Sequence, residues 1–205
     1  AVYKDGEGAV FYALPAIVPP KGEHPRVMVR SSELDQVKAN LEHPQNKSVY
    51  EQVLKYSQQD TLQSVPKGKN LDYMNKLESK AFMYLMTGDK AIGREAVESA
   101  LQYYKNIYLG STVSLQLSRD AGELMTVAAF VYDWCYDQMT DQERQDYVKE
   151  FIRIAETMEC HYPPKRTEPI AGHSSEWMIL RDMLSCGIAI YDEYPDMYNH
   201  VIQML

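Results

Sequence analysis

The chain has 205 residues, with 21 Lys and Arg against 29 Asp and Glu and a formal net charge of −8 at pH 7. Hydrophobic residues make up 45% of the sequence and charged residues 24%, a composition that predicts a packed globular core. The negative charge argues against a uniformly basic protein that binds nucleic acid or a membrane surface. No apolar run reaches the roughly 18 residues of a membrane helix, so no membrane insertion is predicted.

Residues 1–30 are predicted to form an extended arm that lies on the rest of the protein. Prolines in this segment remove backbone donors and disfavour helix at the residues before them; they are Pro15, Pro19, Pro20 and Pro25. The first residues lack the basic, apolar and small-residue order of a signal peptide. Residues 31–205 form the second predicted unit, which is helical.

Helical patterns follow one another from Ser32 onward. The predicted helices span residues 32–41, 47–59, 70–88, 89–110, 118–139, 140–158, 175–190 and 196–205. Gly88 supplies a stop signal, Thr140 and Glu143 form a capping-box pattern, and Pro195 interrupts the chain. Apolar residues at helical spacing form the predicted core stripes: Leu77, Ala81, Tyr84, Leu85, Ala96, Ala100, Tyr103, Ile107, Leu124, Val127, Ala128, Val131, Trp134, Cys135, Val148, Phe151, Ile152, Ala155, Met158, Ile179, Met183, Cys186 and Ile190. The abundant tyrosines, 16 against 4 Phe, suit half-wet surfaces such as grooves.

No segment is a confident strand, so the predicted fold class is all-α, built from antiparallel helical hairpins. Short and long connections alternate along the chain, which places the long loops together at one end. Six basic or titratable residues belong to that end: Lys67, Lys69, Arg119, Lys165, Arg166 and His173. They form either a cationic rim for a polyanionic ligand or a set of charges that only solvate loops.

Three cysteines, Cys135, Cys160 and Cys186, show no CxxC spacing. An odd number with this spacing indicates neither a disulfide framework nor a structural zinc site. Cys135 and Cys186 lie within apolar helical patterns, where a small buried hydrophobic residue is expected.

The segment IAGHSSEWMIL places His173 and Glu176 three residues apart at a predicted helix start. They can share a site, or Glu176 can interact with the positive helix end while a serine caps it. Two ligands are too few for a metal site, and none is predicted. Trp177 can stack on a sugar ring or anchor packing.

Three carboxylates, Asp133, Asp137 and Asp141, flank Trp134 at four-residue intervals. They resemble the paired carboxylates of a glycosidase only superficially. Because they fall towards the short-turn end, a solvated or capping role is predicted for them.

Several long strings resemble the N-terminal part of the bacterial heparin and heparan sulfate lyases of the heparinase II type. These strings are HPRVMVR, VYDWCYDQ, ECHYPP, GHSSEWMILRDMLS and GIAIYDEYPDMYN. Together the resemblance extends from His24 to Asn199. It implies a periplasmic or secreted enzyme with an α/α toroid followed by two β-rich domains, of which this chain is the first part of the toroid.

The resemblance also implies a reaction and roles for particular residues. Such lyases cleave the bond to a uronic acid by β-elimination and leave a 4,5-unsaturated product. His173 corresponds to a base and Glu176 to the group that neutralises the substrate carboxylate, while Arg119 falls where the family presents a cation to the groove. Lys165, Arg166 and Trp177 complete the predicted substrate-binding set.

Other parts of the family's machinery match no position here. A catalytic Tyr, a second His and the structural zinc of a β-domain are expected beyond Leu205, so no cofactor is predicted in this fragment, and the fragment alone is expected to be inactive. The run VIQML at the end has no cap or stop signal, which indicates a truncated helix. A partial ring of helices would leave core faces exposed, and these favour association, as in a homodimer.

Two other functions remain open at this point. One is a lyase of the same architecture that acts on alginate or on chondroitin or dermatan sulfate, since His173 and Glu176 serve any uronate. The other is a helical module without chemistry, which binds anionic glycans or acts as an adaptor. The predicted partner in the preferred interpretation is heparin or heparan sulfate, with no nucleic acid.

Overall fold

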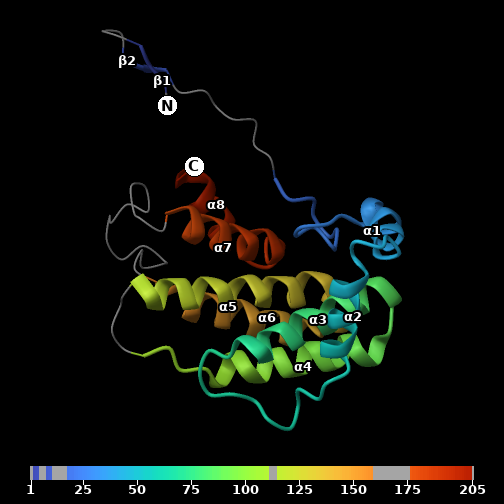
Figure 1. Ribbon diagram of the computed structural model, residues 1–205. Coiled ribbons are helices and arrows are strands. Elements are labelled where there is room, and N and C mark those ends of the chain that lie inside the picture. Colours follow the sequence, from blue (N-terminus) through green and yellow to red (C-terminus); the bar gives the residue numbers. More distant parts are fainter. Residues whose placement is uncertain (1, 5–7, 11–17, 111–114, 159–175, 205) are drawn as a thin grey trace.

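The computed structural model describes residues 2–4, 8–10, 18–110, 115–158 and 176–204, with side chains over 18–110, 117–158 and 180–203. Within these ranges the chain forms eight α-helices and one short antiparallel pair of strands, β1 (Val2–Lys4) and β2 (Gly8–Val10) (Figure 1). The predicted all-α class is therefore confirmed, and the strand pair is a small addition near the N-terminus. None of the described helices is both long and apolar enough to cross a membrane.

Predicted and observed helices agree in number and order, and differ at their ends. The helices are α1 (Leu34–Leu41), α2 (Lys47–Ser57), α3 (Leu71–Thr87), α4 (Lys90–Asn106), α5 (Leu115–Trp134), α6 (Asp141–Ala155), α7 (Glu176–Ala189) and α8 (Pro195–Met204). α4 ends before the predicted Gly110, and α5 ends before the predicted Met139 in a short 3-10 turn over Tyr136–Gln138. Pro195 does not interrupt a helix but begins α8, because its missing N–H is not needed in the first turn.

Side-chain caps fix the helix starts that the sequence predicted best. The Asn70 side chain accepts from the Tyr73 N–H, and Asp89 accepts from two N–H groups of the first turn of α4. Thr140 and Glu143 form the predicted capping box of α6. Gly88 closes α3 with a φ of 71°, a left-handed conformation that glycine adopts without strain.

The long helices alternate in direction, so α3, α5 and α7 run parallel to one another. Lys69, just before α3, contacts Asp120 near the start of α5, whereas Tyr84 near the end of α3 contacts Asp137 beyond the end of α5. α4 and α6 return in the opposite direction as parallel neighbours, joined near their starts by Arg94 and Glu143. We call the end at which α3, α5 and α7 begin the amino end and the opposite one the carboxyl end.

The core lies between these helices and confirms most of the predicted stripes. Leu77, Ala81, Ala96, Leu124 and Phe151 are buried, whereas three predicted core residues are only half-buried, namely Leu85, Val148 and Ile152. Four tyrosines are fully buried rather than on half-wet surfaces: Tyr103, Tyr104, Tyr132 and Tyr147.

The described cysteines behave as the sequence predicted. Cys135 and Cys186 are buried free thiols, and burial raises the pKa of each. Both are therefore packing residues with inert thiols. Cys160 lies outside the described residues.

Candidate functional site

Most of the predicted site falls at the start of α7 or in the segment before it. His173, Lys165 and Arg166 lie outside the described residues. Glu176 and Trp177 are the first two residues of α7, and the structure describes their backbone but not their side chains. Arg119 is the one predicted site residue whose side chain is described.

Arg119 lies in the second turn of α5, at the amino end. It is half-buried, and its Nε is buried without a hydrogen-bond partner among the described residues. A guanidinium carries five donors and no acceptor, so the half-buried Arg119 side chain is suited to an anionic group at this end, although its Nε is itself buried.

The neighbouring Lys69 is held by carboxylates instead. Its Nζ lies 2.7 Å from Asp120 Oδ1 and also contacts Glu123. Burial lowers the pKa of Lys69, but its hydrogen bonds to Asp120 and Glu123 outweigh that effect and raise it. Lys67 is exposed at the same end. The described part of the predicted cationic rim is therefore present in position, but the charge of Lys69 is compensated.

A close contact sets how α5 and α7 lie against each other. Asp182 of α7 is buried, and its Oδ1 accepts from Thr126 Oγ1 of α5 at 2.9 Å and from Arg181 Nε at 2.6 Å. A Cβ on Gly122 would lie 2.1 Å from Asp182 Oδ2, so only glycine permits this approach. Burial raises the pKa of Asp182.

This contact places the starts of both helices at the same end. Gly122 and Asp182 meet, and one turn further on, the Cys186 thiol donates to the Met125 carbonyl at 3.1 Å. Arg119 lies three residues before Gly122, which is about 4.5 Å along the axis of α5 at 1.5 Å per residue. Glu176 lies six residues before Asp182, which is about 9 Å along the parallel axis of α7. The structure thus brings the backbone positions of Arg119 and Glu176 to one end of one helix pair.

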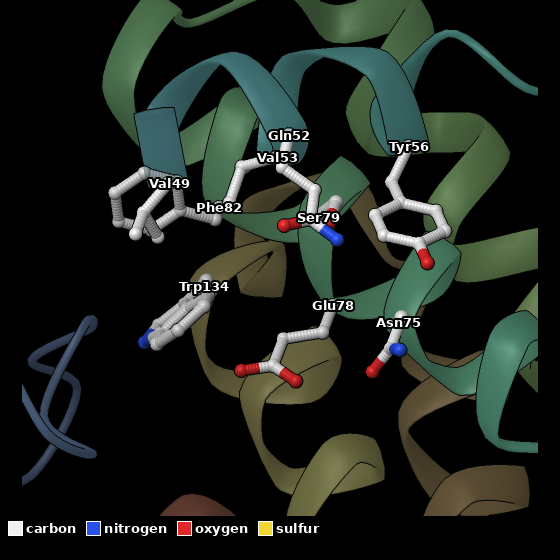
Figure 2. A pocket seen from close by; sticks show the side chains of 9 residues that line it. All are labelled: Val49, Gln52, Val53, Tyr56, Asn75, Glu78, Ser79, Phe82 and Trp134. Carbon is white, nitrogen blue, oxygen red and sulfur yellow. The ribbon is translucent and has the colours of Figure 1, made fainter. Parts of the chain in front are cut away.

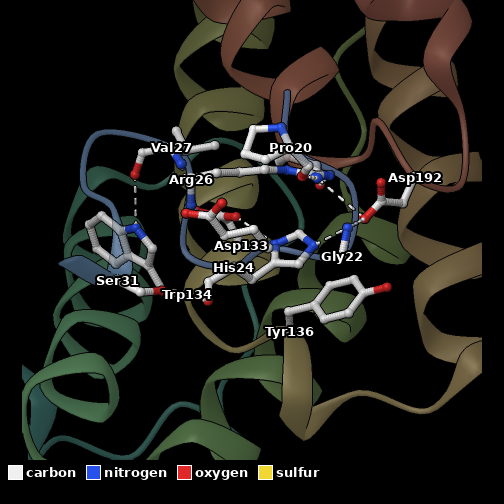
Figure 3. Close-up of polar contacts among 12 residues, drawn as sticks. Pro20, Gly22, His24, Arg26, Val27, Ser31, Asp133, Trp134, Tyr136 and Asp192 are labelled. Atoms are coloured by element: carbon white, nitrogen blue, oxygen red, sulfur yellow. Dashed lines mark hydrogen bonds and ion pairs between the residues drawn. The ribbon is translucent and has the colours of Figure 1, made fainter. Parts of the chain in front are cut away.

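The carboxyl end holds a polar cluster that the sequence did not predict. Asp133 is buried, and its Oδ2 accepts from the backbone N–H groups of Arg26 and Val27, both at 2.8 Å (Figure 3). Its Oδ1 lies 2.7 Å from the Nδ1 of His24, which stacks on Tyr136 with ring centroids 3.7 Å apart. The predicted solvated or capping role of Asp133 is wrong, because the arm covers this carboxylate.

The same cluster joins the arm to the end of α7. The buried Arg26 guanidinium donates to the Ala189 carbonyl at 2.9 Å and to Asp192 Oδ2 at 3.2 Å, and Trp134 Nε1 donates to the Val27 carbonyl at 3.1 Å. Residues 18–30 of the predicted arm therefore lie on the α5–α7 pair. The sequence did carry a signal for the burial of Asp133, which continues the spacing of Gly122, Thr126 and Ala129 along one face of α5, but none for its partners in the arm.

The two other carboxylates of this region differ from Asp133. Asp137 accepts from the Tyr84 hydroxyl at 2.7 Å and is exposed. Asp141 is exposed in the first turn of α6, which agrees with a solvated role. The predicted solvated or capping role is therefore wrong for Asp133, whereas the exposure of Asp137 and Asp141 agrees with it.

Neither a metal-binding group nor a match to other proteins gives further information about this site. Among the described residues no group of three or more His, Cys, Asp or Glu side chains could hold a metal ion. A scan of the chain against protein-family models found no match, and a search of curated proteins found none either. A function for the chain therefore depends on its sequence strings and on the geometry of the amino end.

Proposed function

We propose that this chain is the N-terminal helical region of a polysaccharide lyase that cleaves heparin or heparan sulfate by β-elimination. In this proposal the antiparallel hairpins form part of an α/α toroid, and the enzyme acts in the periplasm or outside the cell. The resemblance of the strings around residues 24–30, 131–138 and 172–199 supports it. The structural observation that carries it is the common position of Arg119 and Glu176 at the amino end.

The reaction removes the proton at carbon 5 of a uronic acid, and the electrons of that bond form the double bond to carbon 4. The bond from carbon 4 to the glycosidic oxygen breaks, and the leaving oxygen takes up a proton. His173 would accept the carbon 5 proton. Glu176 would share a proton with the substrate carboxylate, which stabilises the negative charge that develops there.

The remaining residues would bind the sulfated chain. Arg119, which is half-buried at the amino end, would donate to a sulfate or carboxylate from its guanidinium. Lys165 and Arg166 would add positive charge, and Trp177 would stack on a sugar ring. The group that protonates the leaving oxygen would come from further along the complete protein.

The test is the activity of the complete protein that contains this chain, measured on heparan sulfate by the ultraviolet absorbance of the unsaturated uronate. We expect His173→Ala to lower the rate about 10²- to 10⁴-fold, the usual contribution of a general base. His43→Ala is the matched control, because His43 is exposed at the end of α1 and should leave the rate unchanged.

The other outcomes separate the alternatives. Absorbance that appears only on alginate or chondroitin sulfate would overturn the substrate and keep the mechanism. No absorbance on any uronate polymer, together with retained binding of heparan sulfate, would overturn the lyase and favour a glycan-binding module. Equal rates for His173→Ala and His43→Ala would remove His173 from the mechanism.

A further inference from the structure

A cleft of about 350 Å³ opens between α2 and α3 and is closed on one side by Trp134 of α5 (Figure 2). Each of the two helices presents four side chains to it at the spacing i, i+3, i+4 and i+7, the residues of one helix face. α2 contributes Val49, Gln52, Val53 and Tyr56. α3 contributes Asn75, Glu78, Ser79 and Phe82.

Glu78 is the charged residue of this lining. Its carboxylate lies between Trp134 and Asn75 in Figure 2, and it has neither a hydrogen bond nor an ion pair with any described residue. Other half-buried carboxylates among the described side chains have partners, as Glu143 has in Arg94. Burial raises the pKa of Glu78, because no nearby cation offsets the loss of hydration.

The aromatic wall of the cleft is fixed in place. Trp134 donates its indole N–H to the Val27 carbonyl at 3.1 Å and stacks on Phe130 with ring centroids 4.7 Å apart. Phe82 meets the Trp134 ring at an edge, with centroids 6.0 Å apart. The indole therefore offers a rigid apolar surface a short distance from an unpaired carboxylate.

We propose that this cleft binds a small organic cation, an ammonium group on an apolar body. The ammonium would pair with Glu78, and the body would lie against Trp134 and Phe82. An ammonium carries three donors and no acceptor, which the carboxylate and the amide oxygens of Gln52 and Asn75 can satisfy. The volume is that of a small-molecule site.

An anionic occupant is disfavoured by the same features. The lining contains no Lys, Arg or His, so a sulfated or carboxylated group would meet Glu78 without compensation. This inference is independent of the proposed lyase function, whose anionic substrate is placed at the amino end. Its test therefore concerns the cleft alone.

The test uses phenethylamine as the cationic probe and 2-phenylethanol as its neutral counterpart. The chain is titrated with each, and the indole N–H signal of Trp134 is followed by NMR, assigned by its loss in Trp134→Phe. We expect a saturable shift with phenethylamine and about tenfold weaker binding of 2-phenylethanol, because the neutral probe cannot form the ion pair. Glu78→Gln should bind both probes equally weakly.

Glu51→Gln is the matched control, since Glu51 is an exposed carboxylate of α2 outside this cleft. It should bind phenethylamine like the unchanged chain. Binding should also strengthen as the pH rises through the pKa of Glu78, because the cation pairs with the ionised form. Equal affinity for the two probes in the unchanged chain would overturn the proposal in favour of a merely apolar groove. An unshifted indole signal would overturn it altogether.

Discussion

At the carboxyl end of α3, α5 and α7, Asp133 and Arg26 are buried and bound to backbone groups, whereas at the amino end Lys69 and Glu123 are partly exposed and bound to each other. The side chains of Asp133 and Arg26 are both 0% exposed. Those of Lys69 and Glu123 are 24% and 42% exposed. The two ends therefore use the same residue types in different dielectric surroundings.

This difference separates structural from available charge. A buried carboxylate loses its hydration and needs several donors, so its partners cannot be exchanged without a large penalty. Partly exposed charges are hydrated and screened, so they can exchange one partner for another at small cost. A ligand that competes for charged groups is thus accommodated more easily at the amino end, where the proposed glycan site lies.

The largest expected effect is that of Asp133→Ala. It leaves the N–H groups of Arg26 and Val27 without their acceptor and removes the carboxylate beside His24. We expect the free energy of unfolding to fall by about 3 to 5 kcal/mol, as for a buried charge pair that loses one partner. Urea denaturation followed by circular dichroism measures this change.

Asp141→Ala is the control for that experiment. The Asp141 side chain is 90% exposed and contributes mainly to the first turn of α6, so its loss should cost about 1 kcal/mol or less. Similar losses for the two variants would mean that the arm is not held by Asp133. The comparison of the two ends would then have no energetic basis.

A smaller effect is expected from Gly122→Ala, which tests the contact between α5 and α7. In an exposed helix this change stabilises by about 1 kcal/mol. Here the added Cβ would lie 2.1 Å from Asp182 Oδ2, so the helices must move apart, and we expect a loss of about 1 to 3 kcal/mol instead. A fall in the melting temperature would support this contact, and a rise would contradict it.

Gly68→Ala is the matched control for this prediction. A Cβ at Gly68 meets no atom within 4 Å, so this variant should be close to neutral. If Gly122→Ala were as stable as Gly68→Ala, the starts of α5 and α7 would not be fixed relative to each other by this contact.

The helices could be predicted from the sequence because their signals are local. Asn70, Asp89 and Thr140 act within their own first turns, and Gly88 acts within one turn. The helix ends were less predictable, since α4 stops where Ile107 turns to extended backbone without any glycine or proline. Local signals therefore determined which segments are helical more reliably than where the helices end.

The carboxyl-end cluster could not be predicted in the same way, because its partners are far apart in sequence. His24 and Asp133 are separated by 109 residues. The solvated or capping role of Asp133 was predicted from its place near the short-turn end, and that place gives no information about a partner elsewhere in the sequence. Of the candidate site, Arg119 was predicted at the amino end from loop alternation and is found there, while the roles of His173 and Glu176 stay predictions.

The smallest expected effect is that of Lys69→Met, which removes the cation shared by Asp120 and Glu123. We expect the free energy of unfolding to fall by about 1 kcal/mol or less, because these ion pairs are partly exposed, and to fall by less at high salt. The pKa of Lys69 is raised above 10.5 in the folded protein, so its contribution is fully present below that pH and is lost as the pH rises through the raised value. Lys67→Met, at an exposed neighbouring position, is the control and should leave the free energy of unfolding unchanged. A loss as large as that of Asp133→Ala would show that charge at the amino end is structural too, and an anionic ligand would then have to compete with the fold itself for Lys69.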